Sequence, residues 1–121
     1  MNHLGKHIIL ELYNCNPKLI NCIKYVELSL LESANIAKCN VLHKYFHRFC
    51  PQGITGIVAV SESHFSIHTW PEHNYCAIDI FCCKDDLEAS VDYLIEAFQS
   101  KKCEINTITR GKINETNISN S

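Results

Sequence analysis

Two stretches of the chain place apolar side chains at the three- and four-residue spacing of a helix. In the first stretch, over residues 17–37, the apolar positions are Leu19, Ile23, Val26, Leu30, Ala34 and Ala37. Asn16 is a favourable N-cap before Pro17, so we expect one amphipathic helix from 17 to 37. In the second stretch, one face carries Leu87, Val91, Leu94, Ile95 and Phe98. This face predicts a helix from Asp85 or Asp86 to about Ser100.

The remaining apolar runs favour strands, because most of them alternate with a two-residue period. The predicted strands cover residues 7–13, 40–49, 56–60, 65–70, 76–83 and 102–110. Short turns join the middle strands, which indicates antiparallel pairing. The order β-α-β-β-β-β-α-β predicts an α+β fold, a two-layer sandwich with both helices on one face of an antiparallel sheet. The other face would remain open, and a partner subunit is the simplest cover for it.

Length and charge limit the classes of function. A chain of 121 residues, 46% of them apolar, suits one domain, which we place at residues 1–111. The polar tail at 112–121 should be disordered. A formal net charge of -2 without a basic stripe argues against nucleic acid as a partner. The apolar run at residues 8–10 is too short for a signal peptide, and no run approaches the roughly 18 residues of a membrane span. We therefore expect a cytoplasmic protein that does not enter a membrane.

Eight cysteines and seven histidines raise the alternative of a zinc-binding or non-catalytic regulatory module. His43, His47 and Cys50 would converge on a helix, but their surroundings alternate like a strand. In a strand the two histidines would lie about 13 Å apart. No Cys-x-x-Cys pair is present, and thiols in the cytosol stay reduced. We therefore expect no metal site.

Residues that can support covalent chemistry gather in the middle of the chain. They are Glu62-Ser63-His64, the run Ile67-His68-Thr69-Trp70-Pro71-Glu72 and the pair Cys82-Cys83. In identity and spacing these segments resemble the short, prokaryotic-type S-adenosylmethionine decarboxylase proenzymes of bacteria, which depend on a pyruvoyl group. The same resemblance extends to residues 5–7, 11–15, 46–49, 52–56, 79–83 and 109–111. Because it covers nearly the whole chain to Gly111, it is more specific than any single motif.

The resemblance implies a precursor that cuts itself between Glu62 and Ser63. The products would be a β chain, residues 1–62, and an α chain, residues 63–121. Decarboxylation needs an electron sink that natural side chains lack, and many enzymes use pyridoxal phosphate for this purpose. The resemblance instead implies a covalent pyruvoyl group made from Ser63, with no pyridoxal phosphate.

The same resemblance assigns the steps of the cut. The Ser63 hydroxyl would attack the Glu62 carbonyl and form an ester. Thr55, where the family usually has a serine, matches the donor to the oxyanion. His68 matches the histidine that removes the Ser63 Cα proton, so that the ester breaks by β-elimination.

After the cut, the pyruvoyl ketone would form a Schiff base with the substrate amine. Cys83 matches the family cysteine that returns a proton to the substrate, whereas Cys82 departs from the family pattern. Adjacent strand residues point to opposite faces, so only one of the two thiols can face the site. Phe49 and Glu72 match positions that hold adenosine, and Trp70 should shape the same pocket.

The implied substrate is S-adenosylmethionine, whose decarboxylated product is an aminopropyl donor for spermidine biosynthesis. The implied assembly is a homodimer of processed protomers with sites at or near the subunit interface. One alternative is a pyruvoyl-dependent ornithine or arginine decarboxylase on the same scaffold, if the adenosine pocket has been lost. Another is a paralogue that does not process itself and only regulates a partner. The intact Glu62-Ser63-His64 and His68 argue against it.

Overall fold

The computed structural model describes residues 3–84 and 86–113. In chain order the elements are β1 (His3–Tyr13), α1 (Pro17–Ile20), α2 (Ile23–Ile36), β2 (Val41–Arg48), β3 (Ile54–Val60), β4 (Ser63–Trp70), the 3-10 helix η1 (Pro71–His73), β5 (Tyr75–Cys82), α3 (Glu88–Ala97) and β6 (Lys102–Lys112). The predicted α+β class is confirmed. All six predicted strands are present, and several are longer than expected.

The first predicted helix is wrong in its continuity, because the chain breaks it into α1 and α2 at residues 21 and 22. Asn16 caps α1 as expected, with its side chain accepting hydrogen bonds from two backbone amides. Asn21 ends α1, and its side-chain oxygen accepts a hydrogen bond from the Gly53 amide at 3.1 Å. This hydrogen bond therefore connects the segment between α1 and α2 to the turn before β3.

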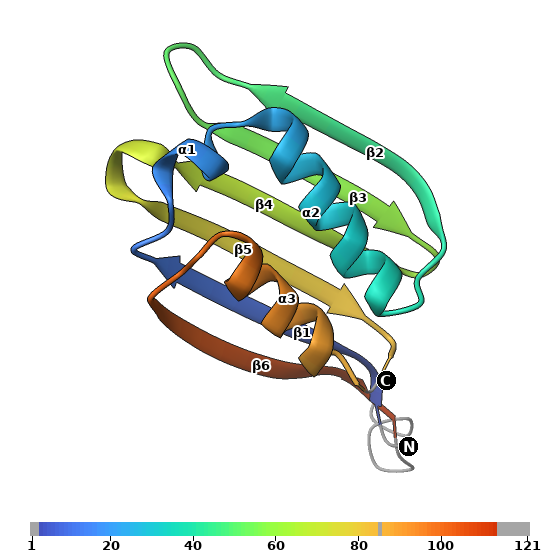
Figure 1. Ribbon diagram of the computed structural model, residues 1–121. Coiled ribbons are helices and arrows are strands. Elements are labelled where there is room, and N and C mark those ends of the chain that lie inside the picture. Colours follow the sequence, from blue (N-terminus) through green and yellow to red (C-terminus); the bar gives the residue numbers. More distant parts are fainter. Residues whose placement is uncertain (1–2, 85, 114–121) are drawn as a thin grey trace.

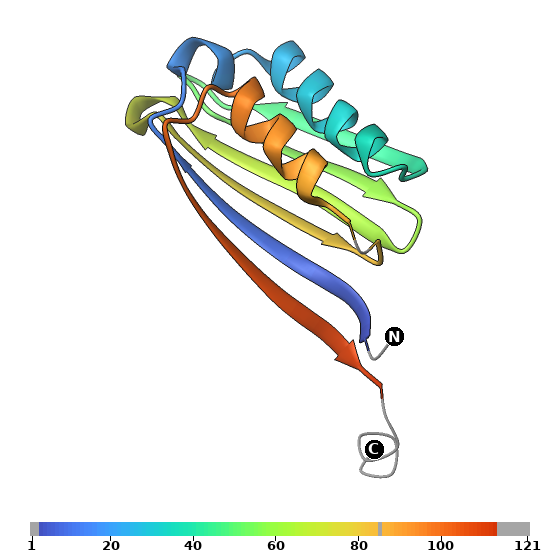
Figure 2. The same cartoon turned by 60° about the horizontal axis from the view of Figure 1, so that its bottom comes forward.

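The six strands form one antiparallel sheet in the order β2-β3-β4-β5-β1-β6. The helices α2 and α3 lie side by side across one face of this sheet, as Figure 1 shows. Seen from the side in Figure 2, all the helices lie above the sheet and the face below it is uncovered. The predicted arrangement, with the helices on one face, is therefore confirmed.

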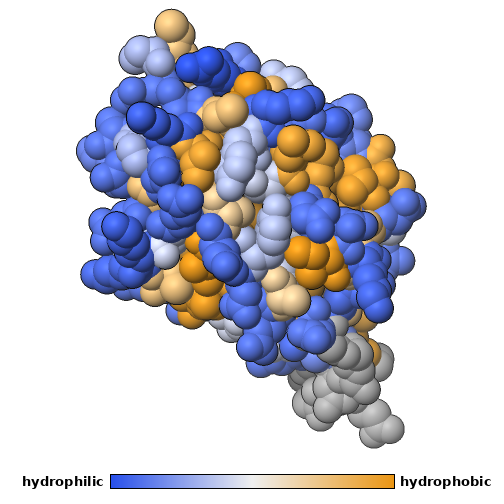
Figure 3. Space-filling view, in the orientation of Figure 1, coloured by the Kyte–Doolittle hydropathy of each residue, from blue (hydrophilic) through white to orange (hydrophobic). Residues whose placement is uncertain are grey.

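The core lies between the sheet and the helices. Every second residue of β3, β4 and β5 is buried there, and α2 and α3 contribute Val26, Leu30, Ala34, Val91 and Leu94. Burying such side chains stabilises a fold by about 1.5 to 3 kcal/mol each. On the helix side, hydrophilic groups surround separate hydrophobic patches (Figure 3).

The opposite side of the sheet, called here the open face, keeps large apolar side chains in contact with solvent. Tyr45, Ile57, Trp70 and Ile108 are each at least 40% exposed. The strand register places all four on this face, because Tyr45 pairs with Ile57, Trp70 pairs with Tyr75 and Ile108 pairs with His7. The single chain therefore has the uncovered sheet face that the sequence predicted.

Two other expectations concern the C-terminal tail and the absence of a membrane-spanning helix. Lys112 still belongs to β6, so the tail expected from residue 112 starts too early. The rest of that prediction falls on residues 114–121, outside the described residues. Among the residues with described positions, no helix is long and apolar enough to cross a membrane.

Candidate active site

The bond predicted to break lies in the turn between β3 and β4. Val60 pairs with Ser63, so Ser61 and Glu62 form a two-residue hairpin turn. Glu62 has a φ of 62°, a left-handed conformation that costs a residue with a side chain roughly 1 to 2 kcal/mol. The Ser63 hydroxyl is buried and makes no hydrogen bond within the described residues. An unpartnered nucleophile therefore lies beside the carbonyl of a strained residue.

The two neighbouring thiols lie at the same end of the sheet, because His64 pairs with Phe81 near the end of β5. Cys82 is fully buried, and its sulfur lies 3.7 Å from the sulfur of Cys39. Partial burial and the hydrogen bond with the Cys82 thiol raise the pKa of Cys39 to about 12, so the Cys39 thiol is protonated at neutral pH. Cys83 is exposed. Of the two, Cys83 alone is accessible to a substrate.

Thr55 and His68 lie near the other end of the sheet. They are paired across β3 and β4, and Thr55 Oγ1 is 3.0 Å from His68 Nδ1. Their strand positions place both side chains on the open face, with the Trp70 ring 6.2 Å from the His68 ring. The sequence predicted both residues for the processing step, and the structure brings these two together.

Ser63 and His68 are not brought together within one chain. They are five residues apart in β4, which corresponds to about 16 Å along an extended strand. The predicted site residues therefore form two groups. Glu62, Ser63 and Cys83 make up what we call the cleavage end of the sheet. The other group, which includes Thr55 and His68, is called the histidine end.

The residues predicted to hold adenosine belong to the histidine end. Phe49 follows β2 and is 49% exposed, and Trp70 closes β4 at 40% exposed. Trp70 stacks on Tyr75 at 5.4 Å, and Tyr75 stacks on Tyr13 at the same distance. The sequence interpretation missed both tyrosines. Strand alternation puts Tyr13 and Tyr75 on the open face, but only the β1–β5 pairing makes them neighbours.

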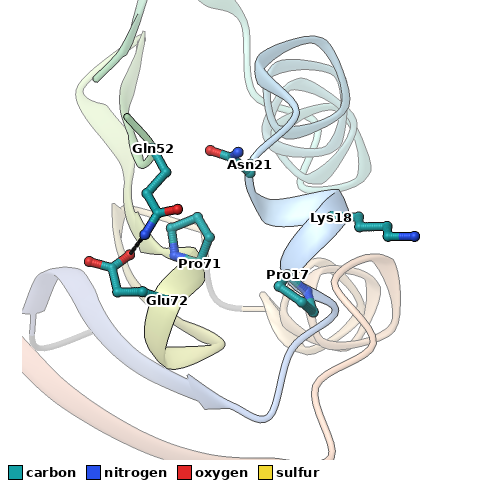
Figure 4. Close-up of a pocket in the computed structure, with 6 residues that line it drawn as sticks. All are labelled: Pro17, Lys18, Asn21, Gln52, Pro71 and Glu72. Atoms are coloured by element: carbon teal, nitrogen blue, oxygen red, sulfur yellow. Dashed lines mark hydrogen bonds between the residues drawn. The ribbon is translucent and has the colours of Figure 1, made fainter. Parts of the chain in front are cut away.

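Glu72 lies in η1, beside an open hollow between α1 and the turn before β3. Its carboxylate accepts a hydrogen bond from the Gln52 side-chain amide at 3.1 Å. Figure 4 shows this pair on one side of the hollow, with Lys18 of α1 and Asn21, the residue after α1, on the other. Glu72 is therefore held near the histidine end in a position that a ligand can reach.

Comparison with known proteins connects this geometry to one family. The family model described as S-adenosylmethionine decarboxylase matches residues 6–111. The chain belongs to this family. The sequence-based recognition is thus confirmed, and the match includes both ends of the sheet.

Individual members of the S-adenosylmethionine decarboxylase family align along almost their whole length. The S-adenosylmethionine decarboxylase proenzyme of Thermosipho melanesiensis is 39% identical over 98% of this chain and 92% of its own. The proenzyme of Clostridium kluyveri is 42% identical over 92% of this chain and 90% of its own. The crystal structure of the adenosylmethionine decarboxylase from Aquifex aeolicus VF5 superposes with a TM-score of 0.87. It is 30% identical and covers 95% of this chain and 97% of its own.

The decarboxylase sheet also carries a polar cluster that the sequence interpretation missed. Asp79 Oδ2 lies 2.9 Å from His7 Nε2 and 3.7 Å from His64 Nε2, and Ser66 donates a hydrogen bond to Asp79 Oδ1. Burial acts to raise the pKa of Asp79. The hydrogen bonds from Ser66 and His7 and the charge of His64 outweigh burial, and the net pKa is lowered. Asp79 is therefore a carboxylate at neutral pH. Since His7 and Asp79 are 72 residues apart, no local motif marks the cluster.

Proposed function

We propose that the chain is a self-processing S-adenosylmethionine decarboxylase whose Glu62–Ser63 bond breaks to generate a pyruvoyl group from Ser63. The observation that carries the proposal is the buried Ser63 hydroxyl, which has no hydrogen-bond partner among residues 3–84 and 86–113 and directly follows left-handed Glu62. Family membership and the S-adenosylmethionine decarboxylase names of the relatives support the reaction and the substrate.

The cleavage end supplies the nucleophile and the bond. Ser63 Oγ forms a new bond to the Glu62 carbonyl carbon, and the peptide C–N bond breaks as the amine leaves. Because Glu62 is strained in the turn, breaking this bond releases backbone strain. The resulting ester then needs a base that removes the Ser63 Cα proton, so that the Glu62 carboxylate leaves by β-elimination and residue 63 becomes dehydroalanine. Water then adds to the imine tautomer of dehydroalanine, ammonia leaves, and the pyruvoyl ketone remains. The family resemblance assigns the role of this base to His68, which is not at the cleavage end.

The histidine end supplies the missing groups. His68 would take the Cα proton, and the Thr55 hydroxyl, 3.0 Å from His68 Nδ1, would donate to the oxyanion. His68 lies about 16 Å from Ser63 along β4 in the same chain, too far for proton transfer, and Thr55 lies opposite His68 on β3. A second copy must therefore bring its histidine end to the cleavage end of the first.

We infer a homodimer in which two open faces meet about a two-fold axis that runs across the strands. This axis places each cleavage end over the histidine end of the other copy and forms two equal sites. The exposed apolar side chains of the open face support the contact, because burying Tyr45, Ile57 and Ile108 stabilises an interface. The shared site is consistent with the expected position at the subunit interface.

In the processed enzyme, the pyruvoyl ketone supplies the electron sink that decarboxylation requires. Cys83 would return the proton to the substrate carbon, because it is the accessible thiol of the pair. Phe49 and Trp70 would contact the adenine ring and the sulfonium, and Glu72 would accept hydrogen bonds from ribose hydroxyls. None of these steps uses pyridoxal phosphate or a metal ion.

Two measurements test this proposal. Intact mass spectrometry of the purified protein should give two chains, residues 1–62 and a blocked 63–121, and one uncut chain would contradict it. Carbon dioxide should then be released from carboxyl-labelled S-adenosylmethionine. Release from ornithine or arginine alone would keep the processing chemistry but overturn the proposed substrate.

A further inference from the structure

The polar cluster lies on the open face across three neighbouring strands in the middle of the sheet, and its His64 directly follows Ser63 at the cleavage end. Asp79 is on β5, with His64 beside it on β4 and His7 beside it on β1. The side chains are 33%, 36% and 20% exposed, so the cluster is neither fully buried nor loose at the surface. Rigid strands therefore hold three possible ligands close together.

The spacing of the three donor atoms suits a single metal ion. The two histidine nitrogens and one Asp79 oxygen all lie within 4.8 Å of one another, and the separations to Asp79 Oδ2 are 2.9 and 3.7 Å. Ligands bound at 2.0 to 2.2 Å around a tetrahedral ion lie about 3.4 Å apart. Small rotations of the two imidazole rings would therefore be enough to bind an ion.

Ser66 gives the carboxylate the support typical of a metal ligand. Its hydroxyl donates to Asp79 Oδ1 and leaves Oδ2 directed at the two histidines. Outer hydrogen bonds of this kind orient a ligand, and losing one typically lowers metal affinity 10- to 100-fold. The three ligands and their support thus come from positions that the sheet fixes.

The donor set selects the kind of ion. Two imidazole nitrogens and one carboxylate oxygen suit Zn²⁺, Co²⁺ or Ni²⁺, whereas Mg²⁺ and Ca²⁺ prefer oxygen ligands alone. The nearby Cys82 thiol is buried on the helix side, so it cannot join the set. A fourth position would be left for water or for a group from the facing subunit.

We propose that His7, His64 and Asp79 bind one divalent transition-metal ion of the zinc class per chain on the open face. This site is distinct from the pair Thr55 and His68, and it goes beyond the proposed function because the decarboxylase chemistry uses no metal. The ion would replace the contacts between Asp79 and the two histidines and would lie between the sheets of the inferred dimer.

Cobalt tests the proposal, because Co²⁺ replaces Zn²⁺ and reports its ligands by visible absorption. The Ser63→Ala chain, which cannot process itself, is expressed in cobalt-supplemented medium so that the ion is present during assembly. Elemental analysis after dialysis should give about one cobalt per chain, with visible d–d bands. A sulfur-to-cobalt charge-transfer band would instead place the ion on thiols and overturn the proposal.

Matched variants in the same background locate the ion. His64→Ala and Asp79→Asn should each lose cobalt, Ser66→Ala should weaken binding about tenfold, and His43→Ala should keep it. Circular dichroism and thermal melting verify that each variant folds. Cobalt far below one per folded parent chain, or retained in folded His64→Ala, would mean that the cluster is an ion-pair network only. Because Ser63→Ala is uncut in every arm, the result does not depend on whether the proposed processing is correct.

Discussion

The two ends of β4 differ in the half of the reaction that each can support. The cleavage end has a strained turn at Glu62 and a buried, unpartnered hydroxyl at Ser63. The histidine end has a formed contact between Thr55 and His68 and an aromatic surface, but no bond to break. The proposed nucleophile and the proposed base are thus separated by most of the length of β4 within one chain, and the proposed dimer would unite them. Variants at each end test this division.

The largest effect is expected at the nucleophile. Ser63→Ala should abolish processing, because no oxygen remains to attack the Glu62 carbonyl. Denaturing electrophoresis should show one band near 13.8 kDa. Ser61→Ala, two residues earlier in the same turn, should still give two chains. Two fragments from Ser63→Ala would mean that the cut lies elsewhere.

At the histidine end, His68→Ala should stop processing at a later step, after the ester has formed. Loss of the base should slow elimination at least about 100-fold, so the ester accumulates. Hydroxylamine should then cleave the purified chain at residue 62, which electrophoresis can follow. His43→Ala, an exposed histidine on β2, should process normally. An intact chain that resists hydroxylamine would argue against this role for His68.

Substitutions at the two adjacent cysteines should distinguish processing of the chain from turnover of the substrate. Cys83→Ala should process but release carbon dioxide about 100-fold more slowly, because the proton donor is gone. Cys82→Ala should lose about 1 kcal/mol of unfolding free energy, since it leaves a small cavity in the core, and should keep most of its activity. Equal loss of activity in both folded variants would contradict the assignment to Cys83.

The smallest effect concerns strain in the turn. Glu62→Gly should process more slowly, by up to about fivefold, because glycine adopts positive φ without strain, so that cleavage no longer releases about 1 kcal/mol of backbone strain. Glu62→Ala keeps the strained conformation and should process at the parent rate. Time courses after cell-free synthesis compare the two. Equal rates for Gly and Ala would show that strain does not contribute.

Local pattern predicted the strands and the opposite faces of Cys82 and Cys83, because both depend on alternation within one segment. The break at Asn21 was missed because it depends on a hydrogen bond to Gly53, 32 residues away. The cluster around Asp79 was missed for the same reason, since His7 reaches it only through strand pairing. The separation of Ser63 and His68 follows from strand spacing alone, but family resemblance gives roles without distances.

Mixed dimers test the shared site most directly. Chains carrying Ser63→Ala and His68→Ala are given different tags, co-expressed and purified through both tags in succession. One of the two sites then combines an intact Ser63 with an intact His68 from the other chain. We predict that the His68→Ala chain is cut after Glu62 in the mixed dimer, although neither variant is processed alone. If both chains of the mixed dimer remain intact, the base does not come from the second subunit.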